Sequence, residues 1–214
     1  MANTNLAFGL QPIQKLGSNV NNVGVSGYTL YEIKNDNSNR IYQGSPVIPL
    51  STGFIDIVGA AAGGTVGLLG VFGGCEFVSS TTGKPVFSNQ WTGSGADSNF
   101  PIKAYVYDDP LQLYKIATDA SVTDEATLRA AVFANANFAT ATSGSNTTGI
   151  SSAKLGVSTI NTTANLNLRI MGWQEDENNS DFAAAGIPVV VRLNNHFNSP
   201  NGAIAGGTVS TTGV

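Results

Sequence analysis

The feature that most constrains this chain is the alternation of apolar and polar residues, which is typical of β-strands with one buried face. It is clearest at 166–170, where Leu166, Leu168 and Ile170 share one face. Side chains of a strand point alternately to opposite sides, so such a segment buries one side only. We expect further strands at 28–34, 46–50, 66–72, 75–78, 102–107, 111–117 and 187–194.

Clusters of turn-forming residues separate these segments. They contain Asn, Asp, Gly, Ser and Pro, which tolerate positive φ, fix φ or bond their own backbone. The clusters lie at 35–39, 81–84, 93–99, 108–110, 143–149 and 175–180. The sequence therefore predicts an all-β fold, mainly an antiparallel sandwich or barrel, with at most one or two short helices and extended terminal arms.

One helix is predicted to begin near Ser121 or Thr123, with acidic residues in its first turn where they favour the positive end of the dipole. Its expected buried stripe consists of Leu128, Ala131, Val132 and Phe138. Asparagine has poor helix propensity, so the asparagines at 135 and 137 limit this helix to about two turns.

The two ends of the chain hold few large apolar side chains. We expect an N-terminal arm at 1–22, a β-rich domain at 23–202 with one or two subdomains, and a C-terminal tail at 203–214. Such ends bury too little apolar surface to offset their ordering entropy alone. In an assembly, arms of this kind can add a strand to the sheet edge of a neighbour.

A weakly charged stretch at 54–74 has about the length of a membrane span, with Asp56 as its one charge. It also contains seven glycines, and glycine disfavours a helix interior by roughly 1 kcal/mol relative to alanine. We therefore expect a strand, a glycine-rich turn and a second strand, and no membrane partner. Residues 1–10 lack the basic and apolar regions of a secretory signal.

The chain carries few charges: 11% of its residues are Asp, Glu, Lys or Arg, against about a quarter in an average soluble domain. Its polar residues are mostly Asn, Ser, Thr and Gly, which lose water at less cost than ions do. This composition favours a structural subunit whose faces are covered by neighbouring molecules. The ten basic residues are scattered and the net charge is −4, so nucleic-acid binding is not expected.

Residues with catalytic chemistry are scarce. His196 is the single histidine, and no serine lies in a G-x-S-x-G turn. Cys75 is the single cysteine and has no neighbouring base in sequence, so a buried thiol is the favoured interpretation. The chain is expected not to be an enzyme, with no catalytic residue, no cofactor and no metal site.

Two acidic segments need separate interpretations. Asp108 and Asp109 precede a proline and are interpreted as a turn between strands. The segment 175–179 is rich in oxygen ligands but lacks the spacing of a calcium-binding loop, so a solvated loop is favoured and weak cation binding stays open.

Aromatic residues offer a sugar-binding alternative. Trp91 with Tyr105 and Tyr107, or Trp173, could stack on a glycan ring. Packing in the core or at an interface is the favoured interpretation.

Four short segments together resemble a family of tailed-phage virion proteins, the capsid decoration or cement proteins. These segments are Phe-Gly-Leu-Gln-Pro at 8–12, Gly-Val-Phe-Gly-Gly-Cys-Glu-Phe at 70–77, Ala-Tyr-Val-Tyr-Asp-Asp-Pro at 104–110 and Arg-Leu-Asn-Asn-His at 192–196. Members of this family often carry charged residues where this chain has Gln11, Gln14 and Asn194, so contacts of those charges are not transferred.

The resemblance implies a β-rich subunit that is made in the host cytoplasm and binds the outer surface of the assembled head. Its partner would be the major capsid protein, and a homotrimer would match local threefold positions of the shell. We assign partner contacts to Phe8, Leu10, Pro12 and Trp91. The alternative function is a tail or surface adhesin or a carbohydrate-binding module.

Overall fold

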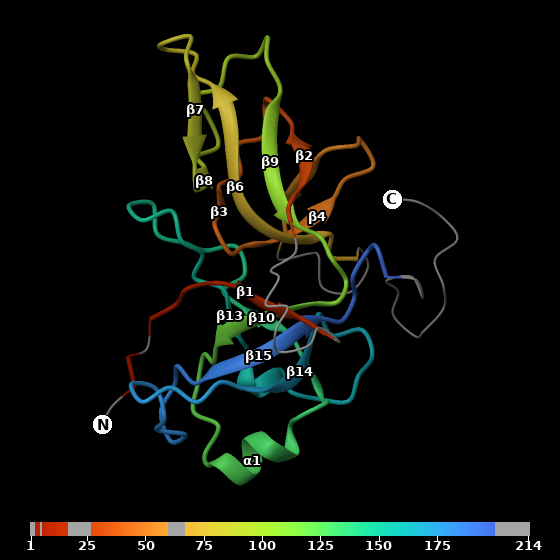
Figure 1. Ribbon diagram of the computed structural model, residues 1–214, viewed down its shortest axis with the longest axis vertical. Helices are drawn as coiled ribbons and strands as arrows, with labels where there is room; N and C mark the ends of the chain where they lie inside the picture. Colours follow the sequence, from red (N-terminus) through yellow and green to blue (C-terminus); the bar gives the residue numbers. More distant parts are fainter. Residues whose placement is uncertain (1–2, 5, 17–26, 60–66, 200–214) are drawn as a thin grey trace.

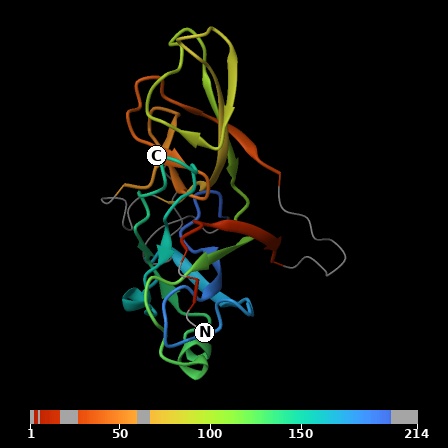
Figure 2. The same cartoon turned by 90° about the vertical axis from the view of Figure 1, so that its left-hand side faces the viewer.

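The computed structural model describes residues 3–4, 6–16, 27–59 and 67–199. Figures 1 and 2 show two lobes stacked along the long axis, each built on a β-sheet. Strands dominate, with one α-helix, α1 (Glu125–Ala130), and one turn of 3-10 helix, η1 (Val157–Thr159), in the described chain. The predicted all-β fold with at most one or two short helices is confirmed.

The upper lobe of Figure 1 contains a six-stranded sheet in the order β4-β5-β2-β9-β6-β7. Its pairings are antiparallel except for the short contact between β2 and β5. The strands are β2 (Thr29–Ile33), β4 (Pro46–Pro49), β5 (Ile55–Ile57), β6 (Gly70–Val78), β7 (Pro85–Ser88) and β9 (Ile102–Tyr107). A short pair, β3 (Ile41–Tyr42) with β8 (Gln90–Trp91), lies in the same lobe.

Strand β9 shows why this sheet has one core face and one outward face. Ile102, Ala104 and Val106 are fully buried, whereas the residues between them are partly or fully exposed. The buried set joins an apolar cluster with Trp91 and Phe72. Each large apolar side chain buried in this way contributes about 1.5–3 kcal/mol.

The lower lobe contains a five-stranded antiparallel sheet in the order β1-β10-β15-β14-β11. Its strands are β1 (Gln11–Lys15), β10 (Gln112–Ala117), β11 (Asn135–Ala136), β14 (Leu168–Trp173) and β15 (Pro188–Leu193). A small pair, β12 (Phe138–Ala139) with β13 (Lys154–Leu155), accompanies it. Its apolar cluster includes Tyr114, Val191 and Ile170. The cluster extends to Leu68, just before β6, and to Val71 within β6, so packed side chains join the two lobes.

The predicted strands at 66–72 and 75–78 are not separate: the end of the first and all of the second belong to one strand, β6, which begins at Gly70. Gly73 and Gly74 lie inside it, and the pairing with β9 shifts register between Phe72 and Gly74. Glycine permits such a bulge because Gly74 adopts φ +150°. Residues 60–66 of the predicted glycine-rich turn lie outside the described residues, and no helix of the described chain is long and apolar enough to cross a membrane.

The N-terminal segment differs from the expected arm. Strand β1 pairs with β10 of the same chain, and Leu10 is 1% exposed within the core of the lower lobe. This pairing and the burial of Leu10 supply the stabilisation that the sequence of 1–22 did not show. The predicted tail at 203–214 lies outside the described residues.

The predicted helix is short, as its asparagines indicate. Asp124 caps α1, because its Oδ1 accepts a hydrogen bond from the backbone N–H of Thr127 at 2.7 Å. Leu128 is buried as expected, but Phe138 lies in β12 and is not part of the helical stripe.

Candidate functional site: an aromatic face of the upper lobe

The outward side of the six-stranded sheet carries a group of exposed apolar side chains. Tyr28, Leu30 and Phe87 are 57%, 55% and 73% exposed. The strand register places Leu30 beside Tyr105, and Tyr28 packs on both Tyr105 and Tyr107. We call these five residues the aromatic face. Contiguous exposed apolar surface of this kind is typical of interaction sites.

The three tyrosines of this face form one cluster. The ring centroid of Tyr28 lies 5.5 Å from that of Tyr105, at an interplanar angle of 70°, and 5.0 Å from that of Tyr107. Burial, and then the neighbouring Tyr28, raise the pKa of Tyr107 to about 12. The phenol is therefore neutral at physiological pH, and it can be covered by a partner without the cost of burying a charge.

Two glycines form a hollow beside this cluster. Gly73 and Gly74 lie at the bulge of β6, and a Cβ atom at Gly73 would stand 3.1 Å from Cε2 of Tyr107. Together with Tyr28, Tyr105 and Phe87 they line a shallow depression of about 390 Å³. The absence of side chains at the two glycines leaves room for a protruding group of a partner.

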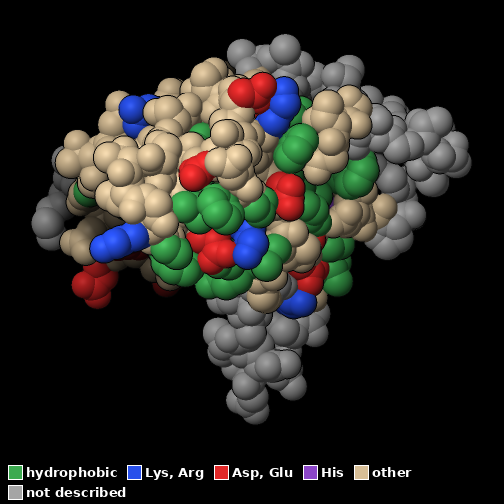
Figure 3. All heavy atoms as spheres, turned by 90° about the horizontal axis from the view of Figure 1, so that it is seen from above, with side chains coloured by type: hydrophobic (Ala, Val, Ile, Leu, Met, Phe, Trp, Pro, Cys, Tyr) green, Lys and Arg blue, Asp and Glu red, His purple; other side chains and the backbone are tan. Residues whose placement is uncertain are grey.

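Two charged residues of this side, Lys103 and Glu76, neutralise one another, and Glu32 lies opposite Lys103 in the strand register. Lys103 Nζ lies 2.9 Å from Glu76 Oε1, and the Tyr105 hydroxyl donates to Glu76 Oε2 at 2.9 Å. These hydrogen bonds from Lys103 and Tyr105 lower the pKa of Glu76, so its carboxylate stays ionised and paired. Figure 3, which looks down on this lobe, shows hydrophobic side chains gathered around a few charged ones.

The four residues predicted to contact a partner do not form one exposed surface. Leu10 and Trp91 are 1% and 0% exposed, so both are core residues in different lobes. The Trp91 indole N–H donates to the carbonyl of Asn37 at 3.1 Å. Phe8 and Pro12 are half-buried in the lower lobe. The Nζ atom of Lys115 lies 5.3 Å from the ring centroid of Phe8, and Pro12 belongs to β1.

The sugar-stacking group proposed from sequence is also divided. Trp91 lies on the core side of the upper lobe, whereas Tyr105 and Tyr107 belong to the outward side of β9. Tyr28, Leu30 and Phe87 were not predicted as site residues. Period-2 alternation with Tyr28, Leu30 and Glu32 on one side was the available signal, but it does not say which side is covered.

His196 and Cys75 are both enclosed. His196 is 1% exposed, and its Nδ1 accepts a hydrogen bond from the backbone N–H of Asn198 at 3.1 Å. Burial lowers the pKa of His196 to about 4 and raises that of the Cys75 thiol to about 12. A thiol held protonated in this way is a poor nucleophile.

The acidic pair after β9 has structural partners. Asp108 accepts hydrogen bonds from Thr29 Oγ1 and Tyr31 Oη, both at 2.8 Å, and thereby connects β9 to β2. Asp109 accepts from the backbone N–H of Leu111 at 2.8 Å in the turn that leads to β10. Among the described residues, no group of three or more His, Cys, Asp or Glu side chains is placed to hold a metal ion.

Comparisons with known proteins identified no relative of this chain. No family model matches the sequence, and neither a curated protein nor a solved structure matches it. Any function assigned to the chain therefore depends on the all-β fold, the aromatic face and the sequence resemblance.

Proposed function

We propose that this chain is a structural virion protein, a capsid decoration or cement protein that binds the outer surface of an assembled phage head. The observation that carries the proposal is the aromatic face, where exposed Tyr28 and Phe87 line a hollow and exposed Leu30 lies beside Tyr105. On the same side of the sheet, Lys103 and Glu76 form an ion pair. Aromatic side chains in well-packed pockets dominate the energy of protein interfaces.

Two of the segments that carry the family resemblance lie at the aromatic face. These segments, 70–77 and 104–110, include most of the paired strands β6 and β9, whose residues Gly73, Gly74 and Tyr105 line the hollow. The resembling residues thus lie next to one another in space, although about 30 positions separate them in sequence.

Binding to the assembled shell alone would stabilise it by linkage. The gain is RT ln(1 + [L]/Kd) per site, about 2.7 kcal/mol when free protein exceeds Kd a hundredfold. A homotrimer would bridge several major capsid subunits at once, because the second and third contacts become intramolecular. In this proposal the protein is synthesised in the host cytoplasm, acts on the capsid exterior and catalyses no reaction.

A co-sedimentation assay with empty heads of the phage that encodes the chain tests the proposal. The wild-type protein is expected to pellet with the heads and to raise their melting temperature. Phe87→Glu, which places a charge at the most exposed position of the aromatic face, is expected to abolish both effects. Phe133→Glu makes the same change at an equally exposed phenylalanine of the lower lobe, so it is the matched control and should bind normally.

Two outcomes would contradict the proposal. One is a wild-type protein that stays in the supernatant at every concentration tested. The other is binding to a glycan array that depends on Tyr28 or Phe87 while heads are not bound, which would favour the adhesin or carbohydrate-binding alternative.

A further inference from the structure

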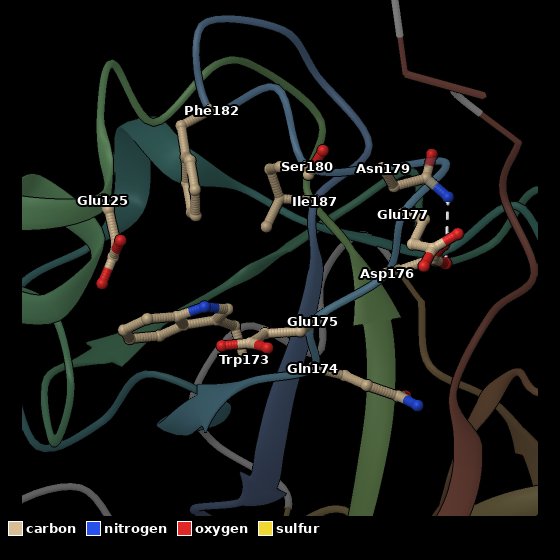
Figure 4. A pocket seen from close by; sticks show the side chains of 10 residues that line it. All are labelled: Glu125, Trp173, Gln174, Glu175, Asp176, Glu177, Asn179, Ser180, Phe182 and Ile187. Carbon is tan, nitrogen blue, oxygen red and sulfur yellow. Dashed lines mark hydrogen bonds between the residues drawn. The ribbon is translucent and has the colours of Figure 1, made fainter. Parts of the chain in front are cut away.

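A second pocket lies in the lower lobe, at the end of β14 and beside the start of α1 (Figure 4). Its volume is about 530 Å³, within the range of small-molecule sites. Trp173, Phe182 and Ile187 supply its apolar surface. The other residues that line it are Glu125, Gln174, Glu175, Asp176, Glu177, Asn179 and Ser180. This pocket plays no part in the proposed function.

The two aromatic rings of the pocket form a right-angled corner. Their centroids are 6.4 Å apart and the ring planes are inclined by 87°. In Figure 4 the Phe182 ring stands over the indole of Trp173, with Glu125 and Glu175 on either side. Indole is the aromatic group that attracts cations most strongly through its ring face.

The structure already shows a cation on this indole. Cζ of Arg129 lies 5.0 Å from the Trp173 ring centroid. Arg129 belongs to α1, forms an ion pair with Glu125 and is not one of the described residues that line the pocket. The ring thus attracts a positive group at one place, and the pocket offers a second place beside it.

All charged residues that line the pocket in the described chain are acidic. Glu125 is paired with Arg129, but Glu175, Asp176 and Glu177 form no ion pair with any described residue. Hydrogen bonds from the Asn178 backbone N–H and the Asn179 side chain lower the pKa of Asp176. The rim is therefore negative at neutral pH and would repel an anionic ligand.

From this geometry we infer that the pocket binds an organic cation, an ammonium or quaternary ammonium group seated in the corner of Trp173 and Phe182. The carboxylates of Glu175, Asp176 and Glu177 supply the counter-charge. A bare metal ion is a poor fit, because no three acidic, histidine or cysteine side chains of the described chain are placed together to hold one. The cation comes either from a basic side chain of a protein or from a free amine, and the two share this chemistry.

The number of tryptophans makes the inference directly measurable. The chain has two, so a ¹⁵N-labelled sample gives two indole N–H signals, one from the buried Trp91 and one from Trp173. The full-length protein is titrated at low salt with choline chloride and, separately, with Nα-acetyl-lysine amide. We expect the Trp173 signal to shift saturably with at least one of them while the Trp91 signal stays in place.

Variants and added salt test whether the carboxylates and the indole both hold the cation. Glu175→Gln, at an exposed position, should raise Kd about 2- to 5-fold without affecting the fold, and added salt should raise it further. Trp173→Ala should raise Kd at least about 5-fold. Glu32→Gln, an equivalent charge change in the other lobe, should leave Kd unchanged.

The two probes also identify the source of the cation. Tighter binding of choline indicates a free quaternary amine, and tighter binding of the lysine derivative indicates a protein side chain. No saturable shift with either probe overturns the inference. So does a Trp173 shift caused by methyl β-glucoside instead, or a cation-induced shift that neither salt nor Glu175→Gln weakens. None of these results bears on head binding, which is assigned to the other lobe.

Discussion

Tyr28 packs against Tyr107 with their ring centroids 5.0 Å apart, although the two residues are separated by most of the upper lobe's sequence. The contact joins the start of β2 to the end of β9 on the outward side of the sheet. It orders an aromatic cluster that is exposed in the described part of the chain. A large ordered apolar cluster at the surface is the arrangement expected for docking.

Truncation of Trp91 should lower the free energy of unfolding far more than truncation of Phe87. Trp91 is fully buried, so Trp91→Ala is expected to lower the free energy of unfolding by about 3–5 kcal/mol. Phe87 is 73% exposed, and Phe87→Ala should change it by about 0.5 kcal/mol or less. Urea unfolding followed by circular dichroism measures both. Equal losses of stability in the two variants would contradict the assignment of Trp91 to the core side and Phe87 to the exposed side of the upper lobe.

The N-terminal segment is expected to be needed for stability. Leu10→Ala should cost about 2–5 kcal/mol because its side chain lies in the core of the lower lobe. Leu6→Ala is the control, since Leu6 is 68% exposed. Deletion of residues 1–15 removes β1 as well and should leave a chain that unfolds at lower urea concentration. A truncated protein of unchanged stability would contradict the pairing of β1 with β10.

The backbone of β6 at Gly70 lies close to the backbone of Tyr107 at the end of β9. Substitution by alanine, which adds one methyl group, tests this contact. A Cβ atom there would stand 2.2 Å from the carbonyl oxygen of Tyr107, so Gly70→Ala should cost about 2 kcal/mol or more. A Cβ atom at Gly27 would have nothing within 4 Å, and Gly27→Ala should change stability by about 0.5 kcal/mol or less. Thermal melts compare the two. A Gly70→Ala protein as stable as wild type would rule out this register of β6 and β9.

His196 should make stability depend on pH. Burial lowers its folded pKa from 6.5 to about 4, a change that nearby Arg192 reinforces and Asp108 and Asp109 oppose. The unfolded chain therefore binds the proton more readily between these values. The contribution of His196 to the free energy of unfolding is therefore fully present above pH 6.5. It is lost as the pH falls toward 4, by up to about 3 kcal/mol.

The variant His196→Asn isolates this effect, because an asparagine oxygen can accept the hydrogen bond that Asn198 donates to Nδ1. Urea unfolding of both proteins between about pH 4 and pH 8 measures it. The wild-type protein should lose more stability than the variant over this interval. Parallel curves would mean that His196 is as easily protonated in the folded protein as in the unfolded one.

Strands with clear alternation were predictable from the sequence. The expected segment 102–107 is β9, in which every second residue is apolar and buried. The expected segment 187–194 contains β15, which begins with a continuous apolar run at 188–191. β1 and β7 were not predicted. Gln-Pro-Ile-Gln-Lys has little apolar character, and in β7 the apolar Val86 and Phe87 are adjacent; pairing with β10 and β6 determines their structure.

The exposed aromatic face was less predictable than the strands, because register decides which side of a strand is covered. Trp91 and Phe87 are both aromatic residues in short strands, yet one is in the core and the other is exposed. Nothing local distinguishes them. The burial of Leu10 has the same origin, since it follows from the pairing of β1 with a strand about 100 residues away.

Docking of the aromatic face on an assembled head can be observed by electron microscopy of heads decorated with the purified protein. We expect density for the protein on the outer surface of the shell, with Tyr28, Leu30 and Phe87 turned toward the major capsid subunits. Density with this face turned to solvent, density on the tail alone, or heads that stay undecorated would contradict the proposed function.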